Sequence, residues 1–303
     1  MTAGQDRRAG AGRTYEIRHR TSYAYEHEVT SSYGRAYLLP RDTAEQHCRS
    51  SRITAKPETD VLAERIDFYG NRTAYLELRA PHRELVVESR SVVEVAREPV
   101  DLEVLGNRGW DHPGRPTVTS TTGWQDLDLL LPSPLVPLTD RLRRYAAGIF
   151  TPGRPLAEAI PALANRIHTN FSYTPGSTHV ASTLDDLLNR GEGVCQDFAH
   201  LAVACLRSAG LPARYVSGYL ETAPPAGRPK LQGVDASHAW ASVRLPELGW
   251  VDIDPTNDRL IDSRYVVTAW GRDYADVPPL KGIIFSTSTS STLSVAVDVR
   301  PLP

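Results

Sequence analysis

The chain has 303 residues, a formal net charge of −2 and 41% hydrophobic residues. This length suits about two domains, and the composition is that of an ordinary globular protein. The near-neutral charge gives no reason to expect a nucleic acid or an anionic membrane surface as a partner. No run approaches the roughly 18 apolar residues of a membrane span, so we predict no membrane association.

Residues 1–12 are polar, basic and glycine-containing, and they have no apolar core of a secretory signal. We therefore predict a flexible tail. The three cysteines (Cys48, Cys195 and Cys205) are odd in number and far apart, which fits neither a disulfide framework nor metal-ligand spacing. These features favour a cytoplasmic location and predict no metal or cofactor.

Short stretches that alternate apolar and polar side chains dominate residues 13–100, with glycine and asparagine at Gly70-Asn71 where a hairpin should turn. Strands at this spacing predict an N-terminal antiparallel β domain, sandwich-like in architecture. Residues 101–155 are rich in proline and glycine. We interpret them as a linker with a short helix that Thr139 would cap.

Residues 156–303 begin with helical patterns and continue as strands, so the fold class is α+β. Apolar residues at helical spacing predict a helix over 156–171, and Ser182 or Thr183 would cap the next one. Strands are then predicted from Ala213 to Val299. We expect this whole stretch to form the second domain, with helices packed on an antiparallel sheet.

A glycine-rich turn at Gly191 and Gly193 leads into a third helical pattern, which Gly210 and Pro212 would end. Cys195 would then lie in the first turn, where free backbone N–H groups and the positive end of the helix dipole favour the thiolate. A buried structural cysteine is the alternative reading. Our hypothesis is that Cys195 is a catalytic nucleophile.

A thiolate nucleophile needs an imidazole partner and a group that orients it. Two strand patterns, at residues 236–244 and 249–254, predict a hairpin. If its loop spans residues 245–247, His238 faces Asp254 with Cβ atoms about 5 Å apart. A carboxylate there can hold one tautomer of the imidazole.

Other residues could take these roles. Asp252 is on the same strand face as Asp254 and is a rival orienting group. His200 lies about 140° around the helix from Cys195, which places it away from the same pocket, and His179 remains a distant alternative.

Several ordered motifs resemble those of bacterial transglutaminase-like proteins. They include Gly193-Val194-Cys195-Gln196-Asp197, Asp235-Ala236-Ser237-His238-Ala239-Trp240, Asp254-Pro255-Thr256-Asn257 and Gly271-Arg272-Asp273-Tyr274. The first 95 residues are similar to the family's N-terminal β region. The resemblance implies a papain-like core and a triad of Cys195, His238 and Asp254.

These residues predict cysteine-dependent acyl transfer on peptide or glutamine carboxamides through a thioester, by transamidation or by hydrolysis. A non-catalytic peptide-binding module on the same fold is the alternative. Either reading implies a peptide or protein partner. Gly193 and Val194 are candidates for positioning the oxyanion or the substrate. Tyr173 and Trp240 would line the substrate groove. No acidic loop of the EF-hand kind indicates calcium.

Overall fold

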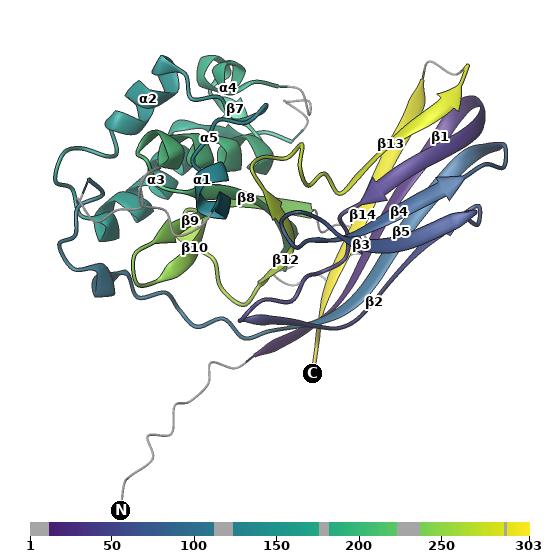
Figure 1. The fold of residues 1–303 in the computed structure, drawn as a ribbon, viewed down its shortest axis with the longest axis horizontal. Coiled ribbons are helices and arrows are strands. Elements are labelled where there is room, and N and C mark those ends of the chain that lie inside the picture. The colour runs from purple at the N-terminus through teal and green to yellow at the C-terminus, as the bar shows by residue number, and fades with distance from the viewer. Residues whose placement is uncertain (1–11, 112–123, 176–181, 223–236, 288–289) are drawn as a thin grey trace, which may run out of the picture.

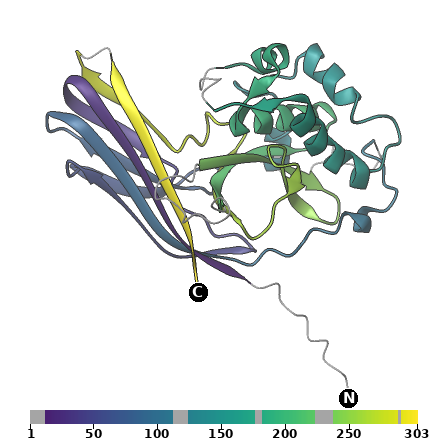
Figure 2. The same cartoon turned by 180° about the vertical axis from the view of Figure 1, so that it is seen from behind.

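The computed structural model describes residues 12–111, 124–175, 182–222, 237–287 and 290–303. Two parts are joined along the chain, a curled antiparallel sheet and an α+β core, so the predicted fold class is confirmed (Figure 1). Figure 2 shows from behind that the core sheet lies between the helices and the first sheet. Among the described residues, no helix has the length and apolarity needed to cross a membrane.

The first sheet is organised around one long strand, β1, whose burial pattern alternates along most of its length. It pairs with β5 along its first half and with β4 along its second half. The path of the sheet is β2-β5-β1-β4-β3. These strands are β1 (Arg13–Ala36), β2 (Gln46–Lys56), β3 (Val61–Ile66), β4 (Arg72–Leu78) and β5 (His82–Val95).

The last two strands, which we expected in the core, belong instead to this first sheet. Both β13 (Leu280–Ser286) and β14 (Ser291–Leu302) pair antiparallel with β1. The apolar residues of β14, such as Val297 and Val299, are buried in one cluster with Tyr15 and Ile17. The result is a single sheet of seven strands. The stretch expected as one domain, residues 156–303, therefore ends in two strands that pair with β1 of the first sheet.

The helices surround α5, which is buried along nearly all of its length. Leu142 and Ala146 of α2 pack in the same apolar cluster as α3 and α5. The predicted linker over 101–155 is thus partly core. The helical elements are the 3-10 helix η1 (Leu102–Leu105), α1 (Trp124–Asp128), α2 (Asp140–Ala147), α3 (Leu156–Asn170), α4 (Leu184–Arg190) and α5 (Cys195–Ser208).

The core sheet has five strands in the order β11-β10-β9-β8-β12. One face, which includes Ala241 and Val243, packs against α5, and the other buries Val216, Trp240 and Tyr265. A short parallel pair, β6 with β7, lies before α5. The strands are β6 (Ser172–Tyr173), β7 (Glu192–Gly193), β8 (Ala213–Leu220), β9 (Ser237–Leu245), β10 (Gly249–Asp254), β11 (Arg259–Leu260) and β12 (Tyr265–Gly271).

Candidate active site

Cys195 is the first residue of α5, as predicted. Gly191 ends α4 in the left-handed conformation with φ of 72°, and the chain turns through β7 into the new helix. The first intrahelical hydrogen bond joins the Phe198 N–H to the Val194 carbonyl. The N–H groups of Cys195 and Gln196 precede that bond and point out of the helix start. Cys195 therefore combines a sulfur with nearby backbone donors.

The Val194 N–H is already engaged, because it donates to Oδ2 of Asp197 at 2.9 Å. This amide is consequently not available to an oxyanion, contrary to our expectation for Val194. Gly193 leaves room for the same carboxylate, since an added Cβ would lie 3.0 Å from Asp197 Oδ2 and 2.8 Å from Leu187. Gly193 and Asp197 thus shape the entry into α5, and Cys195 and Gln196 carry the next N–H groups at the helix start.

His238 and Asp254 are brought together by the β9–β10 hairpin, with Nε2 of His238 2.7 Å from Oδ2 of Asp254. The register differs from the predicted one, because Gly249 pairs with Leu245 and the loop is residues 246–248. The error moves the pairing partner by two residues. Since side chains alternate with a period of two, Asp254 keeps its face and still reaches His238.

Asp254 is fully buried and accepts five hydrogen bonds. Its Oδ2 accepts from His238, from Asn257 Nδ2 at 2.6 Å and from the Tyr265 hydroxyl at 2.7 Å. Its Oδ1 accepts the backbone N–H groups of Thr256 and Asn257. Burial alone would raise the pKa of Asp254, but these donors hold it below its usual value.

Sequence reasoning missed two of these partners, Asn257 and Tyr265. The motif around Asp254 already contained Asn257, three residues on, where an amide can fold back onto the carboxylate. Tyr265 begins a separate strand, β12, and no local pattern links it to Asp254. Both side chains keep the carboxylate charged and immobile behind the imidazole.

His238 is nearly buried, and burial alone would lower its pKa. The hydrogen bonds to Asp254 and to the Cys195 side chain, with the charges of both groups, instead raise the pKa of His238 to about 10. Because Nε2 is bonded to Asp254, Nδ1 is the ring nitrogen left to face the sulfur. The site can therefore hold an imidazolium beside the sulfur of Cys195.

The other candidates have different partners. Oδ2 of Asp252 accepts from the indole N–H of Trp240 at 3.2 Å, so Asp252 does not orient His238. Nε2 of His200 accepts the backbone N–H of Tyr274, and burial lowers the pKa of His200 to about 4. His179 lies outside the described residues.

The two predicted groove residues differ in placement. Tyr173 of β6 is 51% exposed and packs edge-on against Phe198, and its hydroxyl lies within electrostatic reach of Cys195. Trp240 is fully buried and packs against Tyr265, with ring centroids 5.5 Å apart. Trp240 therefore belongs to the core behind His238, and of the two only Tyr173 is exposed beside Cys195.

The model of the bacterial transglutaminase-like N-terminal region matches residues 15–94, and that of the transglutaminase-like superfamily matches residues 143–255. An uncharacterized protein of Mycobacterium tuberculosis is 46% identical over 293 residues, which cover 95% of this chain and 92% of that protein. The chain belongs to the bacterial transglutaminase-like family. Members of this superfamily typically carry out cysteine-dependent acyl transfer or hydrolysis.

A solved structure and a further curated protein also resemble this chain. A Cytophaga hutchinsonii crystal structure, described as a candidate cysteine protease, has a TM-score of 0.74 at 21% identity, covering 95% of this chain and 91% of that one. It shows the same fold. A protein-glutamine gamma-glutamyltransferase of Pseudomonas aeruginosa is 32% identical over 167 residues, 53% of this chain and 24% of that protein.

Proposed function

We propose that this protein is an enzyme that transfers the acyl group of a peptide or glutamine carboxamide through a thioester on Cys195. The observation that carries the proposal is the 2.7 Å hydrogen bond between His238 and the buried carboxylate of Asp254, with Cys195 as the second side-chain partner of His238. A nucleophile, a proton carrier and an orienting group in this order are what acyl transfer requires.

In the first half-reaction, the Cys195 thiolate attacks the carboxamide carbon, and the carbonyl oxygen becomes an oxyanion. The N–H groups of Cys195 and Gln196 stabilise that charge at the helix start. The proton on His238 passes to the departing nitrogen as the C–N bond breaks. Ammonia or an amine leaves, and the acyl group stays on sulfur as a thioester.

In the second half-reaction, His238 removes a proton from the acceptor, which attacks the thioester carbon. The C–S bond breaks and the thiolate is restored, while His238 is again protonated and held by Asp254. An amine acceptor gives transamidation, and water gives hydrolysis. Tyr173 is exposed beside Cys195, which supports a role for it in contacting the acyl donor.

The test compares Cys195→Ala with the matched variant Cys205→Ala, which removes a fully buried sulfur from the same helix. Ammonia release from a glutamine-containing peptide is followed with and without an added primary amine. We expect turnover in wild type and Cys205→Ala and none in Cys195→Ala. Tight peptide binding without turnover by wild-type protein would instead support the non-catalytic binding module.

A further inference from the structure

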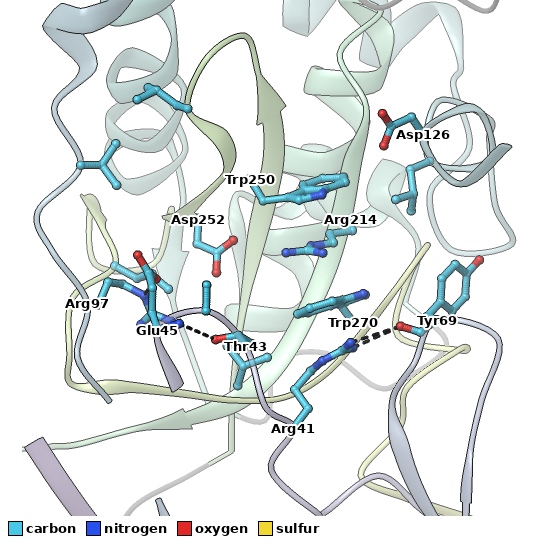
Figure 3. A pocket seen from close by; sticks show the side chains of 16 residues that line it. Arg41, Thr43, Glu45, Tyr69, Arg97, Asp126, Arg214, Trp250, Asp252 and Trp270 are labelled. Carbon is cyan, nitrogen blue, oxygen red and sulfur yellow. Dashed lines mark hydrogen bonds and ion pairs between the residues drawn. The ribbon is translucent and has the colours of Figure 1, made fainter. Parts of the chain in front are cut away.

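A cavity of about 620 Å³ lies against the core sheet. Its wall is formed by the segment after β1, which contributes Arg41, and by the inner face of the core sheet, which contributes Arg214, Trp250 and Trp270 (Figure 3). None of the three proposed catalytic residues lines it. A volume of this size accommodates a small organic molecule.

Arg214 lies between two indole rings in this cavity. Its guanidinium carbon is 4.1 Å from the ring centroid of Trp250 and 3.6 Å from that of Trp270. Arg41 covers the other face of Trp270 at 3.2 Å. Figure 3 shows the guanidinium of Arg214 pointing toward Asp252. Since both flat faces of the guanidinium are covered, only its edge, which carries the N–H donors, is free to bind.

That edge has no protein partner among the described residues, where no hydrogen bond or ion pair within 4 Å engages the Arg214 guanidinium. The side chain is only 7% exposed. Burial lowers the pKa of Arg214 to about 9, which leaves it charged near neutral pH. Asp252 and Asp126 act on this charge only through space, so an anion in hydrogen-bond contact with the guanidinium would stabilise it further.

Other polar atoms of the cavity wall are unsatisfied as well. Of the eight buried side-chain atoms without a hydrogen-bond partner among the described residues, three belong to residues that line this cavity: Nε of Arg41, Nε of Arg214 and Oδ1 of Asp252. Such atoms are rare in folded proteins, and three of them gather at this wall, each covered by neighbouring protein atoms.

The other charged side chains of the wall are engaged. Arg97 is paired with Glu45 at 2.8 Å, and Asp126 is paired with Arg244, which lies outside the cavity lining. Arg41 donates to the Asn71 side chain and to the Tyr69 carbonyl, and the charge of Asp67 acts on it. Arg214 is therefore the cation of the described wall whose donors have no protein acceptor.

We propose that this cavity binds small organic carboxylates, with the edge of Arg214 paired to the carboxylate. A guanidinium edge matches the planar carboxylate in a bidentate arrangement, and the indole walls suit an apolar remainder of the ligand. The carboxylate belongs either to a small free acid or to the C-terminus of a short peptide.

The test uses N-acetylglycine and its neutral amide, N-acetylglycinamide, as probes on the full-length protein. Binding is followed by calorimetry and by tryptophan fluorescence, because Trp250 and Trp270 are two of only five tryptophans. We expect the acid to bind roughly tenfold or more tighter than the amide. N-acetyltriglycine, tested alongside, distinguishes a peptide terminus from a small acid. Equal binding of acid and amide, or no binding of either, would overturn the proposal.

Variants assign the contact to Arg214. Arg214→Gln should abolish the preference for the acid, and Arg214→Lys, which keeps the charge but lacks the planar edge, should weaken it. Arg166→Gln, which removes a guanidinium stacked on Tyr145 outside the cavity lining, is the matched control and should bind as wild type. Cys195→Ala should also bind as wild type, which separates this site from the proposed chemistry. An acid preference that survives in folded Arg214→Gln would contradict the assignment. If that variant does not fold, the comparison of acid and amide binding by the wild-type protein still tests the proposal.

Discussion

The hydroxyl of Tyr265 lies 2.7 Å from Oδ2 of Asp254, the same oxygen that accepts the hydrogen bond from His238. Tyr265 is itself buried and packs against Trp240, so its hydroxyl cannot turn to solvent. A residue of β12 therefore helps to fix a carboxylate of β10. This contact links the position of the proposed orienting group to the packing of the core sheet.

We expect Tyr265→Phe to lower kcat/KM about tenfold and the free energy of unfolding by about 1.5–3 kcal/mol, the usual range for a hydrogen bond to a charged group. The ring stays, and only the donor to Asp254 is lost. The control is Tyr219→Phe, whose buried hydroxyl bonds His19 and not the site. Equal activity of Tyr265→Phe and wild type, at equal folded fraction, would show that this donor has no part in catalysis.

We expect the stability of the protein to depend on pH through His238. Asp254 and Cys195 raise the pKa of His238 to about 10, against the effect of burial. Because the folded-state pKa is raised, protonation of His238 stabilises the folded protein. This stabilisation is fully present below the unfolded-state pKa of about 6.5 and is lost as the pH rises through about 10. Cys195 is one of the groups that raise this pKa, so His238 should titrate at lower pH in the Cys195→Ala variant than in wild type. Proton NMR of the His238 ring measures both midpoints, and identical midpoints would contradict the coupling.

Iodoacetamide at near-neutral pH should label Cys195 first. Cys205 is fully buried, and burial raises the pKa of Cys205 to about 12. Burial also raises the pKa of the half-buried Cys48. The thiolate form reacts, so both should lag behind a sulfur that faces an imidazolium. Peptide mapping over time gives the three rates. Labelling of Cys205 as fast as Cys195 in folded protein would count against an activated thiol.

Gly218 should not tolerate a side chain. An added Cβ would lie 2.1 Å from the Val266 carbonyl oxygen and 2.5 Å from the Trp240 ring. Overpacking of this kind costs about 1–3 kcal/mol or more, and displacement of Trp240 would disturb the neighbouring His238. Denaturant unfolding of Gly218→Ala should show this loss. Gly12→Ala is the control, because its added Cβ meets nothing closer than 3.6 Å; equal stability of the two variants would refute the packing argument.

Local patterns in the sequence were enough for the proposed active-site elements. The helical period after Gly191 placed Cys195 at a helix start, and strand alternation placed His238 and Asp254 on one face of a hairpin. The register was wrong by two residues. His238 and Asp254 are nevertheless on the same face of the hairpin, because a register shift of an even number of residues leaves every side chain on its face.

What the sequence did not reveal is non-local. Alternation predicted strands near the C-terminus, but it does not name their partner, and β13 and β14 pair with β1 more than 240 residues away. Trp240 was expected in the substrate groove. An aromatic residue beside a histidine is equally compatible with the core, and the local sequence does not distinguish the two. The stacking of Arg214 between Trp250 and Trp270 also needs three strands to be placed in space.

The central claim is that Cys195 carries the acyl group. It is tested most directly by intact-protein mass spectrometry after incubation with a library of glutamine-containing peptides, followed by peptide mapping of the adduct. We predict a mass increase that equals the acyl group of the peptide, located on Cys195, released by hydroxylamine and absent from Cys195→Ala. An adduct on another residue, or turnover that persists in Cys195→Ala, would contradict the account.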